Sequence, residues 1–151
     1  MALVEAVARR DIEAGADAVY AALADYRETH GRLLPEQFTA YEVREGGEGA
    51  GTVVFLRLQA TSKRVRECLL DVTEPGERTL VETDRNSTLT TTWTVRENGA
   101  GGARAEVRTT WQGAGGVGGV FERIFAPRGL AAIYDRLLAN LAAELEPARG
   151  A

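Results

Sequence analysis

The 151-residue sequence contains one cysteine, one histidine and one methionine, and these scarcities exclude several kinds of protein. A single cysteine, Cys68, rules out an intrachain disulfide. Because His30 is the one histidine, no cluster of cysteines and histidines at zinc-ligand spacing can form. We therefore expect a protein with no structural metal and no cofactor.

The sequence also lacks an excess of basic residues and a long apolar segment. Eighteen basic and twenty-two acidic residues give a net charge of −4, and the arginines are scattered among the acids. This pattern does not favour nucleic acid as a partner. No stretch approaches the ~18 apolar residues that a membrane-crossing helix needs, and Met1 to Asp11 has no signal-peptide pattern. We expect a cytoplasmic protein without a membrane span, and its oligomeric state, monomer or homodimer, stays open.

The length is that of one domain, and a chain of this size buries roughly 70% of the surface that it exposes when unfolded. We expect residues 1–147 to form this single domain and residues 148–151 to form a disordered tail. The interior of such a domain is large enough for a complete hydrophobic core.

Alternation of apolar and polar residues predicts seven strands and, between the first two, two short helical segments. The expected strands are Val4–Glu13, Phe38–Arg44, Thr52–Gln59, Lys63–Thr73, Arg78–Asp84, Thr88–Arg96 and Arg104–Gln112. Helical spacing from Asp17 to Asp25 predicts one short helix, and Tyr26 to Leu34 predicts a second helix or turn before Pro35. Turn residues such as Gly46-Gly47 and Pro75-Gly76 leave connections short enough only for antiparallel neighbours.

The tripeptide Thr-Thr-Trp occurs twice, at positions 91–93 and 109–111, in the last two expected strands. Centring their turn near Ala100 places Trp93 opposite Val107 and Thr91 opposite Thr109. Because side chains alternate between the two faces of a strand, one face of this hairpin is predicted to be the core face. That face carries Leu89, Thr91, Trp93, Val95, Ala105, Val107, Thr109 and Trp111.

Apolar residues at three- and four-residue steps predict a long amphipathic helix at the C-terminus. The stripe contains Val117, Val120, Phe121, Ile124, Phe125, Leu130, Ile133, Tyr134, Leu137, Leu138, Leu141 and Leu145. Pro127 removes a backbone donor inside this pattern, so we expect a kink there between two apolar halves. The second half, Leu130 to Glu146, would extend for about 25 Å, which is long enough to lie across a sheet.

Three segments of the sequence resemble the START-like, or SRPBCC, superfamily. The segment from Asp17 to Asp25 is similar to its first helix, and Glu74-Pro75 through Glu82 is similar to its mid-sheet hairpin. The C-terminal residues 121–134 are similar to the kinked final helix of the polyketide cyclase/dehydrase and lipid-transport branch. The resemblance covers nearly the whole chain and implies an α+β helix-grip fold, in which a curved seven-stranded antiparallel sheet surrounds the long C-terminal helix.

The resemblance also implies a cavity between the sheet and the helix that holds a lipid, a polyketide, an aromatic or another hydrophobic molecule. None of the matching motifs is a catalytic signature, so no catalytic residue is assigned. The residues expected to line the cavity are His30, Phe55, Glu82, Trp93, Trp111, Phe121, Phe125 and Tyr134. Ordinary core packing is an equal alternative for each of the aromatic residues in this set.

The glycine-rich run from Gly113 to Gly118 spells the GxGxxG pattern of dinucleotide-binding proteins. The strand before it alternates like an antiparallel strand, and no strand follows the final helix to complete a βαβ unit. We therefore interpret the run as a flexible hinge in front of the helix and not as a cofactor site.

Two residues are candidates for reactivity. His30 has the one side chain whose ordinary pKa lies near neutrality, which makes it the candidate general acid or base. Its place on an expected loop beside Tyr26 and Glu28 favours a partly exposed surface residue instead. Cys68 lies in an expected strand and is interpreted as core.

Four charged residues of the middle strands, Arg57, Arg64, Arg66 and Glu82, also alternate along the chain. Most are expected to be solvated, because a charge that points into the core needs a paired charge or a ligand group. The register of the hairpin at Pro75-Gly76 decides the side of Glu82, and the sequence leaves that register open.

Three functions are compatible with these patterns. The first is binding of a hydrophobic small molecule, with walls formed by Trp93 and Trp111. The second is an aromatase/cyclase-like enzyme that acts on a polyketide intermediate, which requires polar pairs that point inward. The third is a protein-interaction module, which requires an exposed apolar patch.

Overall fold

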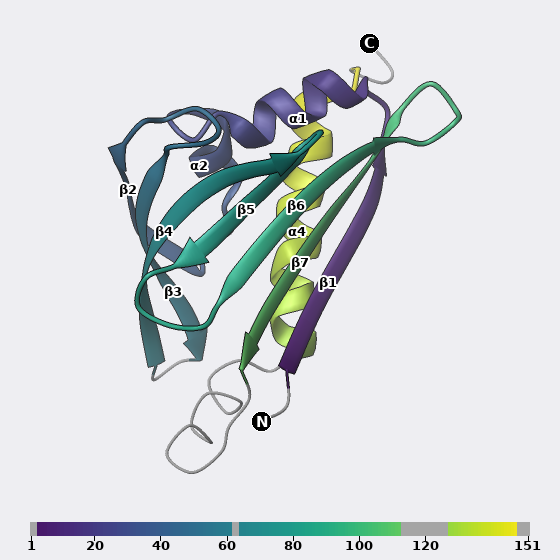
Figure 1. Cartoon of the computed structure of the whole chain (residues 1–151). Helices are drawn as coiled ribbons and strands as arrows, with labels where there is room; N and C mark the ends of the chain where they lie inside the picture. Colours follow the sequence, from purple (N-terminus) through teal and green to yellow (C-terminus); the bar gives the residue numbers. More distant parts are fainter. Residues whose placement is uncertain (1–2, 62–63, 113–126, 148–151) are drawn as a thin grey trace.

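The computed structural model describes residues 3–61, 64–112 and 127–147 of the chain (Figure 1). The strands are β1 Leu3–Ile12, β2 Phe38–Glu45, β3 Val53–Thr61, β4 Arg64–Gly76, β5 Thr79–Asp84, β6 Thr90–Glu97 and β7 Ala103–Gln112. The helices are α1 Ala16–Ala24, α2 Thr29–Leu33 and α4 Pro127–Leu145. The strands form a seven-stranded antiparallel sheet in the order β1-β7-β6-β5-β4-β3-β2.

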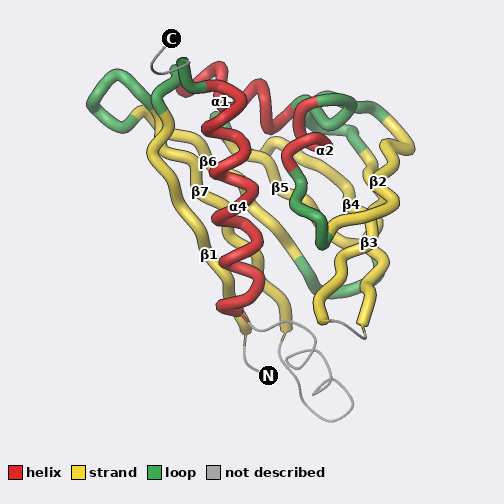
Figure 2. The backbone as a smooth tube through the Cα atoms, turned by 180° about the vertical axis from the view of Figure 1, so that it is seen from behind, coloured by secondary structure: helices red, strands yellow, loops and turns green. Residues whose placement is uncertain are grey.

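The curved sheet wraps around α4, which confirms the α+β helix-grip fold predicted from the sequence. Figure 2 shows α4 lying along one face of the sheet, in front of β1, β7 and β6 in this view, while α1 and α2 cover the upper end of the same face. Because β1 and β2 form opposite edges of the sheet, the two short helices carry the chain from one edge to the other. The core therefore lies between the sheet, α4 and this helical crossing.

The hairpin of β6 and β7 has the predicted register. Trp93 lies opposite Val107, and Thr91 lies opposite Thr109. All eight residues assigned to the core face of this hairpin are buried, and the exposed fractions of Trp93 and Trp111 are 2% and 0%. Both indoles therefore lie inside the protein, where their large apolar surfaces stabilise the packing of sheet against helix.

The turn between β4 and β5 differs from the expectation at Pro75-Gly76. Strand β4 continues to Gly76, with an irregularity in its pairing between Thr73 and Gly76, and the turn residues are Glu77 and Arg78. Such an irregular position accommodates Pro75, which has no backbone N–H to donate to a neighbouring strand. The resulting register puts Leu80, Glu82 and Asp84 on the core face of β5.

Helix α4 presents its apolar stripe to the sheet as predicted. Leu137, Leu138 and Leu141 are fully buried. A hydrogen bond joins α4 to the end of α2, since Asn140 donates to the backbone oxygen of Leu33 at 2.9 Å. The described part of this helix begins at Pro127, so the expected kink and the apolar half from Val117 to Phe125 lie outside the described residues.

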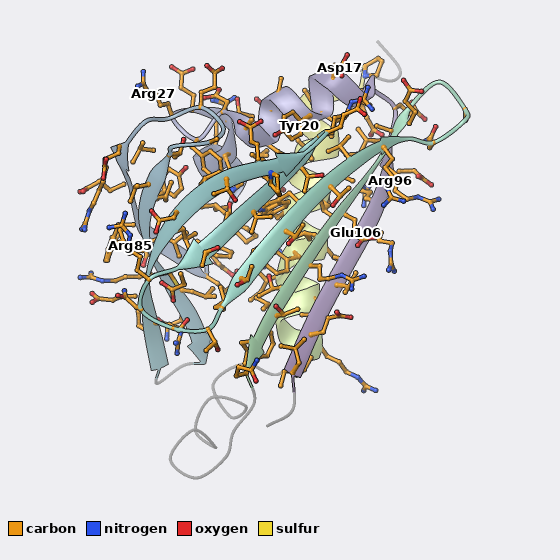
Figure 3. All side chains as sticks on the ribbon, in the orientation of Figure 1. Asp17, Tyr20, Arg27, Arg85, Arg96 and Glu106 are labelled. Carbon is orange, nitrogen blue, oxygen red and sulfur yellow. The ribbon has the colours of Figure 1, made fainter. Side chains whose placement is uncertain are left out.

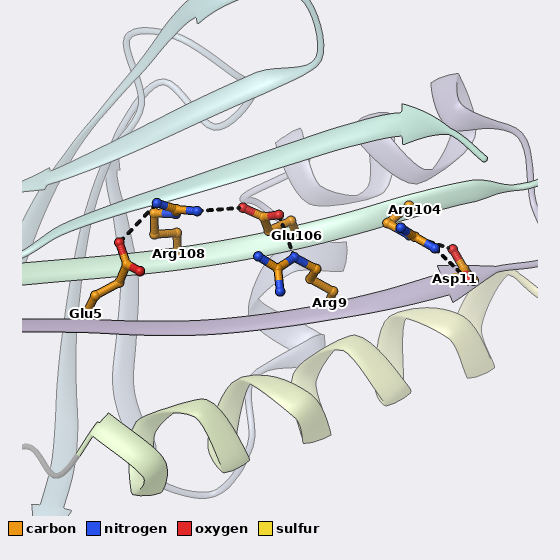
Figure 4. A network of polar contacts seen from close by, with 6 residues as sticks. All are labelled: Glu5, Arg9, Asp11, Arg104, Glu106 and Arg108. Carbon is orange, nitrogen blue, oxygen red and sulfur yellow. Dashed lines mark hydrogen bonds and ion pairs between the residues drawn. The ribbon is translucent and has the colours of Figure 1, made fainter.

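The outer face of the sheet carries charged side chains, as the sticks around Arg96 and Glu106 in Figure 3 illustrate. On β1 and β7 these form cross-strand ion pairs, shown in Figure 4, that include Arg9 with Glu106 at 2.9 Å and Arg104 with Asp11 at 3.0 Å. Exposed pairs of this kind contribute little to stability individually. Their effect is to keep this face of the sheet solvated, so that the apolar face is the one directed at α4.

Within the described ranges, no helix combines the length and the apolar character that a bilayer-spanning segment requires.

Candidate functional site

The segment between α1 and α2 brings an aromatic and a titratable side chain over the middle of the sheet. The end of α1 is attached to the loop between β2 and β3, because Tyr26 N donates to Gly47 O at 2.9 Å and Gly49 N donates to Ala24 O at 2.9 Å. The backbone of His30 then donates to Asp25 O at 2.8 Å, which starts the short turn of α2. This local structure directs both Tyr26 and His30 into the core, with exposed fractions of 1% and 3%.

His30 was expected on a surface loop, and this expectation is wrong. The imidazole lies in α2 and is buried, because the attachment of α1 to the β2–β3 loop turns the following residues inward. Its Nδ1 lies 2.7 Å from the backbone oxygen of Leu23. A carbonyl oxygen accepts hydrogen bonds and cannot donate them, so Nδ1 carries a hydrogen and Nε2 is the nitrogen available to the core.

Glu82 is the acidic partner on the sheet side of this cluster. It lies on β5, a strand in the interior of the sheet, and its Oε2 is 3.6 Å from His30 Nε2. The same oxygen accepts a hydrogen bond from the hydroxyl of Tyr26 at 2.7 Å. Burial and the nearby Glu82 carboxylate raise the pKa of Tyr26 well above its ordinary value, so the phenol remains a donor. The sequence left the side of Glu82 open, and the β4–β5 register points it inward.

A second polar cluster joins the sheet to α4. The hydroxyl of Thr109 donates to the hydroxyl of Tyr134 at 2.7 Å, and Thr91 and Thr109 are 2.7 Å apart. Thr91 also lies 3.4 Å from the Tyr134 hydroxyl. Burial raises the pKa of Tyr134 to about 12. Because Thr91 is the cross-strand neighbour of Glu82, this cluster adjoins the His30–Glu82 pair.

The two clusters and the aromatic rings between them border one cavity. His30 stacks on Tyr26 with ring centres 4.4 Å apart, and it meets Trp93 at an interplanar angle of 82°. Trp93 in turn meets Tyr134 at 82°. The remaining wall consists of apolar side chains of β2, β3 and β4, among them Phe38, Leu56 and Leu70. The cavity is therefore an apolar space with a few polar groups in its walls.

The cavity is small. The space open to the centre of a water-sized sphere is about 30 Å³, where one water needs roughly 10–15 Å³. The rings of Phe38 and Tyr41, together with Leu34, form the half-buried part of its lining. A ligand larger than about two waters therefore requires lining side chains to move.

Comparison with known proteins identifies the family. The family model described as polyketide cyclase / dehydrase and lipid transport matches residues 4–146. The chain belongs to this family. No curated protein matches the sequence. Among solved structures, that of KanY protein is 44% identical, covers 95% of this chain and 98% of its own, and superposes with a TM-score of 0.86.

More distant members of the fold superpose over nearly the whole chain. A protein from Thermus thermophilus is 18% identical with a TM-score of 0.73, and the match covers 93% of this chain and 95% of that protein. The di-domain ARO/CYC protein BexL, from the BE-7585A biosynthetic pathway, is 19% identical with a TM-score of 0.70. That match covers 97% of this chain and 51% of BexL. At these identities the two likenesses show the shared fold.

Four of the eight residues predicted to line the cavity border it, namely His30, Glu82, Trp93 and Tyr134. Phe55 does not, because it alternates with the inward residues Val54 and Leu56 and lies on the outer face. There the guanidinium carbon of Arg44 is 4.6 Å from its ring centre. That assignment is therefore corrected.

The other aromatic candidates have different positions. Trp111 is fully buried but is not part of the lining of this cavity. Phe121 and Phe125 lie outside the described residues, as does the glycine-rich run from Gly113 to Gly118.

The remaining charged and sulfur-containing candidates are largely as expected. Arg57 is exposed and pairs with Glu67 at 3.0 Å, as a solvated side chain would. Arg66 is half-buried, and burial lowers its pKa. Cys68 is core as predicted, and burial raises the pKa of its thiol to about 12, which suppresses its nucleophilic form. Within the described part of the chain, no group of three potential ligands is placed to hold a metal ion.

Sequence reasoning missed the role of Tyr26 and Tyr41 in this site. Tyr26 provides the hydrogen bond to Glu82, and the hydroxyl of Tyr41 donates to Tyr26 O at 2.5 Å. Tyr26 and Glu82 are 56 positions apart, and no local pattern connects them. Thr91 and Thr109 carried a usable signal, because polar residues at predicted core positions indicate an internal hydrogen-bond network.

Proposed function

We propose that this protein binds a small, largely apolar molecule in the cavity between the sheet and α4. The observation that supports it is the combination of apolar walls with a few converging polar groups, which is typical of small-molecule sites. The family description, which includes lipid transport, is in agreement. Aromatic rings would provide most of the contact area, and the polar groups would fix the orientation of the ligand.

The affinity of such a site would come from apolar burial. A ligand that hides a few hundred Å² of apolar surface gains several kcal/mol at roughly 25 cal/mol per Å². Because the entropic cost of association is subtracted from this gain, we expect binding no tighter than the micromolar range. The half-buried side chains of Leu34, Phe38 and Tyr41 are the ones whose movement would enlarge the cavity.

Binding is tested with the fluorescent apolar probe N-phenyl-1-naphthylamine and delipidated protein. Leu70 borders the cavity, whereas its neighbour Leu69 faces the other side of β4. Because an added ring at position 70 occupies ligand space, Leu70→Phe is expected to weaken probe binding by about tenfold, a change of about 1.4 kcal/mol. Leu69→Phe is the matched control and should leave the affinity unchanged.

Equal affinities of Leu70→Phe and Leu69→Phe would place the probe elsewhere and contradict the proposed site. Absence of saturable probe binding by the wild-type protein would contradict the proposed function itself. Mass spectrometry under native conditions adds a second measurement, in which co-purifying lipids or aromatic compounds are expected with the wild-type protein and reduced with Leu70→Phe.

The second candidate is an aromatase/cyclase-like enzyme that acts on a polyketide intermediate. The specific observation that favours it is the inward polar pair of His30 and Glu82, because a buried imidazole beside a carboxylate can move protons in a water-poor site. The family description includes cyclases and dehydrases, and BexL carries the ARO/CYC designation. In this role His30 Nε2 would exchange the proton and Glu82 would orient the ring.

The enzyme hypothesis is tested with a short poly-β-ketone thioester and analysis of its cyclised products. His30→Ala and Glu82→Gln should both change the product distribution, whereas Arg57→Gln, on the outer face, should not. An unchanged distribution for both inward variants would contradict catalysis by this pair. The two variants would still be expected to bind the apolar probe, which separates this test from the preceding one.

The third function considered, a protein-interaction module, has less support. In the described ranges the exposed large hydrophobic side chains are Leu3 and Val65, which lie on separate strands and form no patch.

A further inference from the structure

Two residues that border the cavity carry a hydrogen-bond donor that lacks a good acceptor in the described part of the chain. Trp93 Nε1 is buried and has no hydrogen-bond partner there. Buried donors are almost always paired in native proteins, because leaving one unpaired loses the hydrogen bond that it made to water. Trp93 is therefore an exception that needs an explanation.

The hydroxyl of Tyr134 is the second donor. Its oxygen accepts the hydrogen of Thr109 at 2.7 Å, so the hydrogen of the tyrosine itself needs another acceptor. In the described residues that acceptor is Thr91 Oγ1, at the long distance of 3.4 Å. A hydroxyl bound this weakly can turn toward a better acceptor at little cost.

The two donors belong to neighbouring rings. Trp93 and Tyr134 meet edge to face with centres 5.9 Å apart, and both border the cavity. Glu82 and His30 border the same cavity but already interact with one another and with Tyr26. Trp93 and Tyr134 therefore carry donors that remain available to a ligand.

We propose that Trp93 and Tyr134 together form a subsite for an oxygen atom that only accepts hydrogen bonds, such as the carbonyl oxygen of a ketone or an ester. This inference rests on the proposed binding function and specifies its ligand as an apolar molecule with a carbonyl group. The indole N–H and the phenol O–H donate to the carbonyl oxygen, while the apolar part of the ligand lies against Phe38, Leu56 and Leu70. Hydrocarbon ligands of the same shape leave both donors unpaired and bind more weakly.

The subsite is tested with acetophenone and isopropenylbenzene, which have nearly the same shape and differ in a carbonyl oxygen replaced by a methylidene group. The wild-type protein is expected to bind acetophenone about three- to tenfold more tightly, which is the net effect of one or two hydrogen bonds. Trp93→Phe and Tyr134→Phe should each reduce this ratio, and the double variant should bring it to about one. Trp111→Phe, which changes an indole outside this cavity, is the matched control and should keep the wild-type ratio.

A spectroscopic measurement makes the test independent of variant stability. The chain has two tryptophans, so its nitrogen–proton correlation spectrum has two indole signals, which the variants assign. Acetophenone should move the Trp93 indole proton downfield, whereas isopropenylbenzene should not, and the Trp111 signal should respond to neither in this way. Equal binding of the two compounds, or a ratio that survives the double variant, would overturn the subsite and leave the proposed function standing. Failure of both compounds and of the fluorescent probe to bind would overturn the proposed function.

Discussion

At the scale of single residues, this core is notable for the polar side chains that it encloses. His30, Glu82, Thr91 and Thr109 are all less than 6% exposed. Burying such groups is costly unless they are paired, and here each is paired with a residue distant in sequence. A core built for stability alone would use apolar residues of the same volume at these positions. Their presence therefore supports a site that interacts with a ligand.

In the hydroxyl cluster of Thr91, Thr109 and Tyr134, we expect substitutions at Tyr134 and Thr109 to lower the free energy of unfolding by different amounts. Tyr134→Phe leaves the 2.7 Å contact between the two threonines intact, so we expect a loss of about 0.5–1.5 kcal/mol in the free energy of unfolding. Thr109→Val removes the central member and leaves two buried hydroxyls poorly paired. For this variant we expect a loss of about 1–3 kcal/mol. Urea unfolding monitored by circular dichroism measures both values.

Thr110→Val is the control for this pair, because Thr110 is the half-buried neighbour on the other face of β7. Its free energy of unfolding should differ from that of the wild type by less than about 0.5 kcal/mol. A Tyr134→Phe variant that loses more stability than Thr109→Val would show that the phenol, and not Thr109, is the centre of the cluster.

At the scale of elements, the close approach of α2 to β2 shapes the cavity. A Cβ atom at Gly31 would lie 2.7 Å from Cε1 of Tyr41, so glycine is required for this contact. Tyr41 also donates to the backbone of Tyr26, which connects β2 to the segment that carries His30. One small residue thus lets a five-residue helix pack directly on a strand and hold the site in place.

Gly31→Ala is therefore expected to destabilise the protein although alanine favours helix formation. Displacing the Tyr41 ring costs about 1–3 kcal/mol, and the helix preference of alanine returns about 1 kcal/mol. The net loss in the free energy of unfolding should be about 1 kcal/mol in urea unfolding. The matched control is Gly76→Ala, because the nearest atom to a Cβ there is Thr79 Oγ1 at 3.8 Å. A Gly31→Ala variant as stable as Gly76→Ala would show that α2 and β2 can separate freely.

At the scale of the whole molecule, the four tyrosines share one property. Their positions are Tyr20, Tyr26, Tyr41 and Tyr134, and burial is the largest cause of a raised pKa for each. For Tyr20 the hydrogen bond to Glu74 adds to this effect, and for Tyr26 and Tyr41 the Glu82 carboxylate does so. The fold therefore keeps its phenols protonated where an unfolded chain would ionise them.

This property predicts a loss of stability in alkali. Below the unfolded pKa of about 10, both states hold the phenol protons and the stability is complete. As the pH rises above about 10 the unfolded chain releases these protons first, so the free energy of unfolding falls. Tyr26 and Tyr134 should each contribute a fall of about 1.4 kcal/mol per pH unit until they ionise in the folded state.

Near-ultraviolet absorbance of tyrosinate measures the difference in tyrosine ionisation between the folded and the unfolded chain. In native protein at about pH 10.5 the signal should be small, whereas in strong denaturant all four tyrosines should titrate near pH 10. Rapid transfer to alkaline buffer keeps the protein folded during the measurement. Titration of two or more tyrosines near pH 10 in the native state would contradict the burial described here.

Much of the fold was predictable because it depends on local patterns. The alternation in β6 and β7 predicted the burial of Trp93 and Trp111, and the spacing in α4 predicted the burial of Leu137 and Leu141. The site was less predictable. His30 was expected at the surface because nothing in its own neighbourhood shows that α1 is attached to the β2–β3 loop. Phe55 was assigned to the cavity by its type, whereas its place in the alternation of β3 puts it outside.

The sequence by itself determined which residues form strands and helices and which face of each is apolar, since these follow from periods of two and 3.6 residues along the chain. Only the tertiary structure decided which polar groups meet. The His30–Glu82 pair joins residues from α2 and β5, and the Thr109–Tyr134 bond joins β7 to α4. The positions of such pairs depend on how the elements are packed in three dimensions, and packing is a property of the whole chain that no local period contains.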